Sequence, residues 1–347
     1  MKTSFVSSLS ISQAMRYSTM RTSSDLVKAQ KELDTGKVFD SGLALGARTA
    51  QTVTFARDIE RLNGIVDSNG LVSARLTATQ EALGQIAGAA QEFLGVLAAS
   101  TSGAAGPSVT SHSGGAVLAA LTSIMNTPIN GEYIFAGINT DVKPLEGFAA
   151  GSPAKAAFDA AFLAHFGFAQ NDPAAANITG AQMDAFVTTA LEPQFLGAGW
   201  QANWSNATDE PVTSRITLNE MAETSVSANS EGIRKLAMTT SIISDLLQAP
   251  LNENARNALI DQSRVLVGEA IADVQNVQAK VGLVQNRVVS ANERLSMQVE
   301  IMTKNLDDMQ GVDPYEAATR LNDLLTQIET SYALTSRIQQ LSLLKYL

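Results

Sequence analysis

Cysteine is absent from the 347-residue sequence, which excludes thiol nucleophiles, disulfide bonds and cysteine-bound metals. Histidine is scarce: His112 lies in a Ser- and Gly-rich segment and His165 in a Phe-rich one, and we interpret them as a solvated loop residue and a helix-surface residue. No GxSxG, HExxH, Walker or GxGxxG pattern occurs. We therefore predict that the protein is not an enzyme and uses no cofactor or metal.

Positive charge is also limited, with 24 Lys and Arg against 34 Asp and Glu and a net charge of −10. This balance argues against a nucleic-acid surface and against a polybasic membrane anchor. Apolar runs are short and broken by Ser, Thr and Gln, so we expect no transmembrane span. The start, MKTSFVSSLSISQ, has no continuous apolar region and no small-residue cleavage site. We expect a protein that stays in the cytoplasm or leaves it without a cleavable signal peptide.

Proline and aromatic residues are rare outside the middle of the chain. Both Trp and eight of twelve Phe fall within residues 131–204, and seven of nine Pro fall within residues 107–211. The flanks consist largely of Ala, Leu, Val, Gln and Ser. This distribution predicts long helices at both ends and a compact, turn-rich module inserted between them.

The two flanks carry apolar residues at heptad spacing. Thirteen of fifteen positions spaced 3.5 residues apart between 260 and 309 are apolar, as are eleven of thirteen between 55 and 97. Burial of one aliphatic side chain contributes about 1.5–3 kcal/mol, so the two stripes should cover each other. The predicted fold class is mainly α: long heptad-patterned helices from both chain ends form a bundle or coiled coil, with a small inserted α+β domain.

Glycine interrupts both helical flanks toward the chain ends. Gly36, Gly42 and Gly46 break the pattern before the first long helix. After the second, the segment DMQGVDPYEAA predicts a helix that ends near 310 and another that begins at about 314. Its four signals are a C-cap, an N-cap, a first-turn proline and a reciprocal capping carboxylate, at Gly311, Asp313, Pro314 and Glu316 respectively.

The middle module has signals of both helix and strand. Ser152 is predicted to cap a helix with Phe158, Phe162 and Phe166 on one side, and Thr179 with Gln182 is predicted to form a capping box. Strands are predicted in the segments 131–141, 210–220 and 224–229.

The last helix has more apolar surface than its own chain can cover. The N-terminal segment offers only a weak stripe that includes Tyr17, so leaving the C-terminal side chains half wet would forgo about 10 kcal/mol. We therefore expect other chains to supply the cover. The predicted assembly interface consists of Val6, Leu9, Met20, Val27, Leu321, Leu324, Ile328, Leu334, Ile338, Leu341 and Leu344.

These residues and their order resemble the bacterial flagellin superfamily. The segment 30–46 is similar to the family's Leu-Ser-Ser-Gly-Lys connector, with Asp34-Thr35 in place of the serines, and residues 282–287 are similar to its Gly-x-x-Gln-Asn-Arg stretch. Two features look most like the hook–filament junction member, the flagellin-like hook-associated protein 3. One is a Gly-x-Tyr-x-Phe-x-Gly-x-x-Thr segment at 131–140 and the other is the ending LSLLKYL, with Lys345 where Asp is usual.

The resemblance implies a structural subunit of the flagellum that links the hook side to the filament. Its implied partners are other copies of itself, the neighbouring hook-associated junction protein, flagellin, the flagellar export apparatus and an export chaperone. It implies secretion to the flagellum and three parts: a terminal coiled-coil assembly domain (1–40 with 312–347), a long-helix core (41–130 with 222–311) and an inserted outer domain (131–221).

Two alternatives stay open. One is filament flagellin, from the same superfamily. The other, of a different class, is an intracellular helical scaffold or an enzyme with an unrecognised site.

Overall fold

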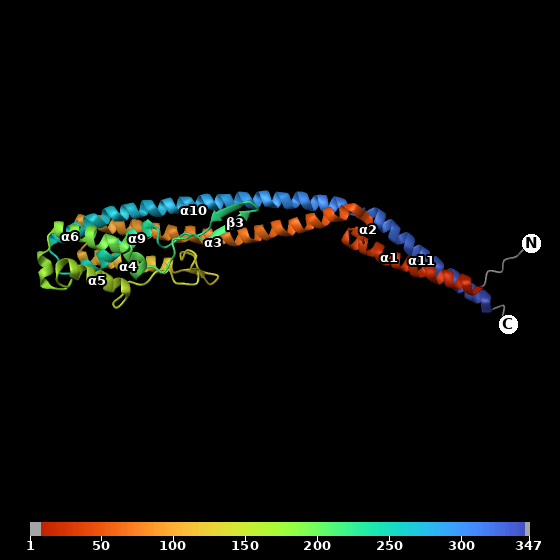
Figure 1. Ribbon diagram of the computed structural model, residues 1–347, viewed down its shortest axis with the longest axis horizontal. Helices are drawn as coiled ribbons and strands as arrows, with labels where there is room; N and C mark the ends of the chain where they lie inside the picture. The colour runs from red at the N-terminus through yellow and green to blue at the C-terminus, as the bar shows by residue number, and fades with distance from the viewer. Residues whose placement is uncertain (1–7, 344–347) are drawn as a thin grey trace, which may run out of the picture. The chain divides into compact units, whose positions relative to one another are not determined.

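The long helices predicted from the heptad patterns are present, and the mainly helical fold class is confirmed. The computed structural model describes residues 8–343, and the side chains of residues 10–337 (Figure 1). The chain divides into two compact units, residues 1–64 with 295–347 and residues 65–294. The division falls within helices α3 (Thr49–Thr101) and α10 (Glu253–Gln310). The three-part division drawn from the sequence stays a prediction.

The unit that contains the chain ends is built on an antiparallel helix pair. Helix α1 (Ser8–Thr35) contacts α11 (Pro314–Leu343) along its length. Between α1 and α3 lie the short helix α2 (Ser41–Leu45) and the 3-10 turn η1 (Gly46–Arg48). Asp40 caps α2 by accepting a hydrogen bond from the backbone N–H of Leu43.

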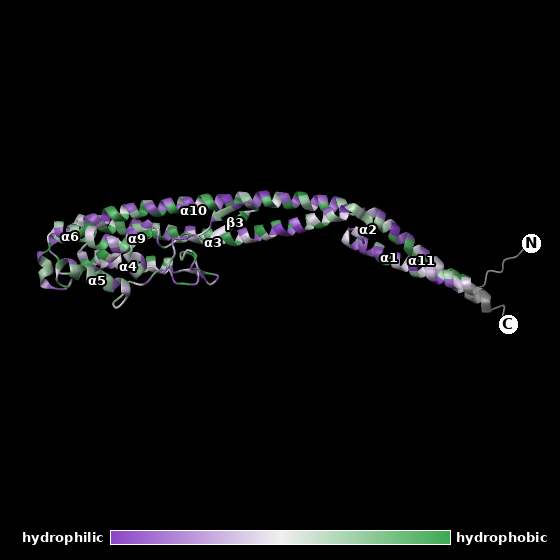
Figure 2. Cartoon of the chain, viewed as in Figure 1, coloured by the Kyte–Doolittle hydropathy of each residue, from purple (hydrophilic) through white to green (hydrophobic). Residues whose placement is uncertain are grey.

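In residues 65–294, α3 and α10 run antiparallel with their apolar stripes together. Asn69 and Gln80 of α3 hydrogen-bond to Asn292 and Gln278 of α10, respectively, which defines the direction of the pair. Stripe positions from both helices are buried, as the heptad pattern predicts. Among them are Leu76, Leu83, Ile86, Phe93 and Leu97 of α3, and Val267, Val274, Val281 and Val288 of α10. In Figure 2, hydrophobic and hydrophilic bands alternate along α10, as expected of a helix with one covered side.

Glycine mediates close packing of two further helices on each other and of one of them on α10. Helices α4 (Pro107–Met125) and α9 (Glu231–Leu246) contact each other closely, because a Cβ at Gly114 would lie only 3.0 Å from Ile243. A Cβ at Gly232 of α9 would lie 2.9 Å from the carbonyl oxygen of Ala270 in α10. Lys235, one turn further along α9, bonds to two acidic residues of α10. The four helices therefore form one bundle.

The inserted module is a set of short helices around an aromatic core. Trp200 and Trp204 are buried and stacked with ring centroids 5.7 Å apart, and Phe148 stacks on Trp204 at 5.3 Å. The predicted caps are confirmed: Ser152 accepts from the Lys155 N–H, and Thr179 with Gln182 forms a capping box. The helical elements are α5 (Pro153–Phe166), η2 (Pro173–Asn177), α6 (Gly180–Phe186), the π-helical turn η3 (Val187–Leu191), α7 (Glu192–Phe195) and α8 (Gly199–Asn203).

Two antiparallel hairpins complete the module. Strand β1 (Pro128–Ile129) pairs with β2 (Glu132–Tyr133), and β3 (Thr213–Thr217) pairs with β4 (Glu220–Glu223). The strand predicted within 210–220 is confirmed by β3. The prediction of a strand at 224–229 is wrong, because the segment forms only one isolated antiparallel bridge, between Ser227 and Ala136, in which the Ala228 N–H donates to the Phe135 carbonyl at 2.8 Å.

The segment 131–141 is a strand only at its start, because two glycines turn it. Gly131 has φ +88 and Gly137 has φ +66, and the Tyr133 N–H donates to the Thr140 carbonyl at 2.7 Å. At Gly137 a Cβ would lie 2.3 Å from Oγ1 and 2.5 Å from the carbonyl oxygen of Thr208. The spaced glycines of this motif therefore encode a tight loop packed on residues 208–210, in place of the predicted strand.

Among the described residues, one helical run, Ser41–Thr101, is long and apolar enough by length and composition to cross a membrane. Core helices of soluble proteins meet the same criterion, and the stripe positions of α3 from Leu76 to Leu97 are buried inside the bundle. Packing inside the bundle covers 39% of this apolar window.

Candidate assembly interface

The α1–α11 pair closes on small side chains. Ala29 of α1 and Ala317 of α11 are 2% and 1% exposed, which lets the two backbones come close. Leu321, Leu324 and Ile328 of α11 are half-buried at heptad spacing on the side that faces α1. The half-buried positions of α1 comprise three large apolar side chains, Met15, Leu26 and Leu33, and five polar ones, Ser12, Thr19, Thr22, Asp25 and Glu32.

The apolar stripe predicted for α1 lies on its outer side. Tyr17, Met20 and Val27 are 75%, 70% and 60% exposed. These residues do not pair with the C-terminal helix, because α11 packs on the neighbouring side of α1, which contains Ala29. An exposed row of large apolar side chains on α1 is left without cover in the single chain.

Helix α11 also has two sides. Leu334 is 50% exposed, so it departs from the side shared by Leu321, Leu324 and Ile328. Tyr315 and Tyr332 are 85% and 63% exposed. Apolar surface therefore projects from both helices of the pair.

Five of the predicted interface residues lie outside the described residues in whole or in their side chains. These are Val6, Leu9, Ile338, Leu341 and Leu344.

The two breaks in the helices meet. The Val38 N–H donates to the carbonyl of Gln310 at 2.9 Å, and the Val312 N–H donates to the carbonyl of Gly36 at 3.0 Å. Lys37 and Gly311 pair as an antiparallel bridge. The connector after α1 and the connector after α10 thus run alongside each other.

The predicted helix signals at 311–316 are mostly confirmed. Helix α10 ends at Gln310 and α11 begins at Pro314, and the Asp313 carboxylate accepts from the Tyr315 N–H at 2.8 Å. Glu316 does not close the capping box, since its carboxylate pairs with Arg320 at 2.9 Å.

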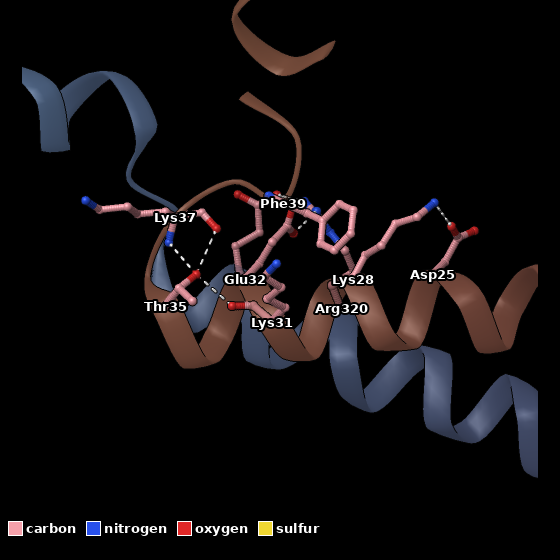
Figure 3. Close-up of polar contacts among 9 residues, drawn as sticks. Asp25, Lys28, Lys31, Glu32, Thr35, Lys37, Phe39 and Arg320 are labelled. Atoms are coloured by element: carbon pink, nitrogen blue, oxygen red, sulfur yellow. Dashed lines mark hydrogen bonds and ion pairs between the residues drawn. The ribbon is translucent and has the colours of Figure 1, made fainter. Parts of the chain in front are cut away.

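A carboxylate that the sequence did not single out bridges this region (Figure 3). Glu32 of α1 accepts from the Phe39 N–H at 3.0 Å with one oxygen and from Arg320 of α11 at 3.3 Å with the other. Thr35 and Lys37 hydrogen-bond to each other beside it, and Lys31 lies over the Phe39 ring. The sequence contained one signal for Glu32: it is an acidic residue near the end of a predicted helix, shortly before the break at Gly36.

Both histidines lie exposed on helices. His112 lies exposed on α4, so its prediction as a loop residue is wrong, and His165 lies exposed on α5 as predicted. No group of three or more His, Asp or Glu within the described part of the chain is arranged to bind a metal ion.

The most strongly buried charges have structural partners. Burial works against the charge of Lys235, but the hydrogen bonds that its ammonium donates to the carboxylates of Asp273, Glu231 and Glu269 raise its pKa well above the ordinary range. Burial raises the pKa of the Asp245 carboxyl, opposed by Lys155 at 3.3 Å.

Both terminal regions match known families. Residues 6–140 match the bacterial flagellin N-terminal helical region, and residues 265–347 match the bacterial flagellin C-terminal helical region. The chain belongs to the bacterial flagellin family. Together the two matches take in more than half of this flagellin-family chain, including both helices of the α1–α11 pair.

A solved structure has the same fold. It is a protein of Vibrio parahaemolyticus provisionally described as a flagellar hook-associated protein, and it is 9% identical, with a TM-score of 0.52 over 76% of this chain and 97% of that one. No curated protein matches this chain significantly. Flagellin-family domains are structural and not enzymatic, so this chain is a structural subunit of the bacterial flagellum, and its family assembles from many copies.

Proposed function

We propose that this flagellin-family chain is a hook-associated junction protein that links the hook side of the flagellum to the filament. The likeness of residues 131–140 and of the ending LSLLKYL to that member supports the junction role over the filament role. The fold shared with the Vibrio parahaemolyticus protein is consistent with it. In this role the chain is secreted without a cleavable signal peptide, and its partners are its own copies, the neighbouring junction protein, flagellin, the export apparatus and an export chaperone.

The observation that carries the assembly role is the set of exposed apolar side chains on the outer sides of α1 and α11. Met20 and Val27 on α1 and Leu334 on α11 are at least half exposed. Full burial of one such side chain contributes about 1.5–3 kcal/mol, so a row of them favours association. A contact of this kind between unlike surfaces repeats from copy to copy and builds a helical array.

We assign different roles to the two sides of the pair. The outer side, with Met20, Val27 and Leu334, contacts neighbouring subunits, and Val6, Leu9, Ile338, Leu341 and Leu344 extend the interface toward the chain ends. Leu321, Leu324 and Ile328 act through the chain's own pair, which presents the outer side. The terminal domain (1–40 with 312–347) then assembles, the core (41–130 with 222–311) supports it, and the insert (131–221) lies away from the contact.

The test places the same charge on each side. We expect Met20→Asp to leave the free chain folded, since the site is 70% exposed, but to block incorporation at the hook tip because a buried unpaired carboxylate costs several kcal/mol. Leu324→Asp should instead lower the helicity of the free chain, and Met20→Leu, which stays apolar, should assemble normally. Circular dichroism and motility give the two readouts. Normal motility with Met20→Asp would show that the outer side of α1 is not an interface.

The junction role is separated from the filament role by a deletion strain viewed by electron microscopy. Loss of a junction protein leaves hooks without filaments and flagellin shed into the medium. Purified chain that grows long filaments on filament seeds would instead identify a filament flagellin, and a chain found only in cytosol would favour the intracellular scaffold.

A further inference from the structure

The two connectors satisfy backbone groups that their own helices leave unpaired. The last carbonyls of a helix have no partner within it. The carbonyl of Gln310, at the end of α10, receives the Val38 N–H, and the carbonyl of Gly36, just after α1, receives the Val312 N–H. Each connector therefore caps the helix that precedes the other connector, and neither helix end has all of its backbone hydrogen bonds without the opposite connector.

Glu32 binds this pair of connectors to α11. Its side chain is 15% exposed, and its two oxygens bond to different elements, the Phe39 N–H of the first connector and the guanidinium of Arg320. Figure 3 shows the carboxylate between the first connector and Arg320. Arg320 also pairs with Glu316 in its own helix, an exposed i,i+4 pair of the kind that contributes little.

We propose that Glu32 is a positioning residue that makes the two connectors open and close as one unit. We call residues 36–40 and 311–313 together with Glu32 and Arg320 the connector clasp. When the clasp is closed, α1 and α11 are anchored at the same point, so the pair presents its outer side in one arrangement. When Glu32 is substituted, the backbone amides of both connectors lose protection from hydrogen exchange together.

Hydrogen–deuterium exchange on the full-length chain, kept dilute, measures this coupling. The readouts are the peptides that contain residues 36–40 and residues 311–313. We expect Glu32→Ala to speed exchange about five- to tenfold in both peptides, the change expected for loss of a charge-assisted bond. Arg320→Gln should give a smaller change in both. Glu316→Gln, which removes the other partner of Arg320, is the matched control and should change neither.

The decisive comparison is the second connector, which Glu32 does not touch. Faster exchange at 36–40 with unchanged exchange at 311–313 would mean that Glu32 is only a local cap of the first connector and would overturn the coupling. Unchanged exchange at both would overturn the clasp as well. Should Glu32→Ala lower the helicity, Glu32→Gln is read by the same criterion, since it keeps one oxygen to accept from the Phe39 N–H and replaces the oxygen that accepts from Arg320 by an NH2 donor. The clasp is a property of the single chain, so its failure would leave the junction role standing.

Discussion

Within the Gly-x-Tyr-x-Phe-x-Gly-x-x-Thr segment at 131–140, Gly137 is the position that most strictly requires glycine. We expect Gly137→Ala to destabilise residues 65–294 for two reasons. Its φ of +66 is in the left-handed region, which costs an L-residue about 1–2 kcal/mol. In addition, the new methyl would lie 2.5 Å from the Thr208 carbonyl oxygen and 2.9 Å from that of Glu210. Backbone cannot yield as a side-chain tip does, and overpacking of this kind costs about 1–3 kcal/mol more.

The shift of residue 208 would also weaken three hydrogen bonds. Thr208 donates its N–H to the Ala136 carbonyl at 3.1 Å, accepts from the Ile138 N–H at 2.9 Å, and accepts from the Ser227 hydroxyl at 2.7 Å. The total expected loss of unfolding free energy is about 2–5 kcal/mol, at the upper end of single substitutions. Urea unfolding followed by Trp fluorescence measures it, because Trp200 and Trp204 are both buried in this unit.

Two other glycines separate the contributions. Gly131 also has a positive φ, +88, but nothing lies within 4 Å of its Cβ position, so Gly131→Ala should cost only the conformational part, about 1–2 kcal/mol. Gly147 has open space and no positive φ, so Gly147→Ala should change stability by less than about 1 kcal/mol. If Gly137→Ala costs no more than Gly131→Ala, then the contact with Thr208 is not what requires glycine, and our account of the loop is wrong.

Two further predictions concern buried polar groups. Because burial raises the pKa of Asp245, protonation of this carboxyl favours the folded state: its contribution to stability is fully present below its ordinary pKa of about 3.9 and is lost as pH rises through the raised value. Asp245→Asn should therefore reduce the dependence of the unfolding free energy on pH across that interval. Urea unfolding at a series of pH values measures it, and an unchanged pH dependence would contradict the assignment. Asn69 is fully buried and donates to the Ile216 carbonyl at 2.9 Å and to Asn292 at 2.8 Å, so Asn69→Ala should cost about 1–3 kcal/mol by leaving both acceptors without a donor. Asn63→Ala, at an exposed position of the same helix, is the control and should lie within about 0.5 kcal/mol of the parent; equal effects would mean that the Asn69 bonds are replaced by water.

Helix periodicity and helix ends could be predicted from the sequence because both depend on neighbouring residues. The 3.5-residue spacing places Leu83 on the apolar side of α3 and Val274 on the apolar side of α10, wherever those helices lie. Both residues are buried, as this pattern predicts. Gly311, Asp313 and Pro314 act within a few residues of one another, so the end of one helix at 310 and the beginning of the next at 314 could also be predicted.

What only the tertiary structure decided is which surfaces meet. Helix α1 has apolar residues on two sides: Tyr17 and Met20 lie on the outer one, yet α11 packs on the side with Ala29. The leucines of α11 already supply apolar area there, and small residues opposite them let the helices approach closely. Glu316 illustrates the same limit: its spacing suits a capping box, but Arg320 competes for its carboxylate. The bond between Glu32 and Arg320 joins residues 288 positions apart, and no local pattern encodes a contact of that kind.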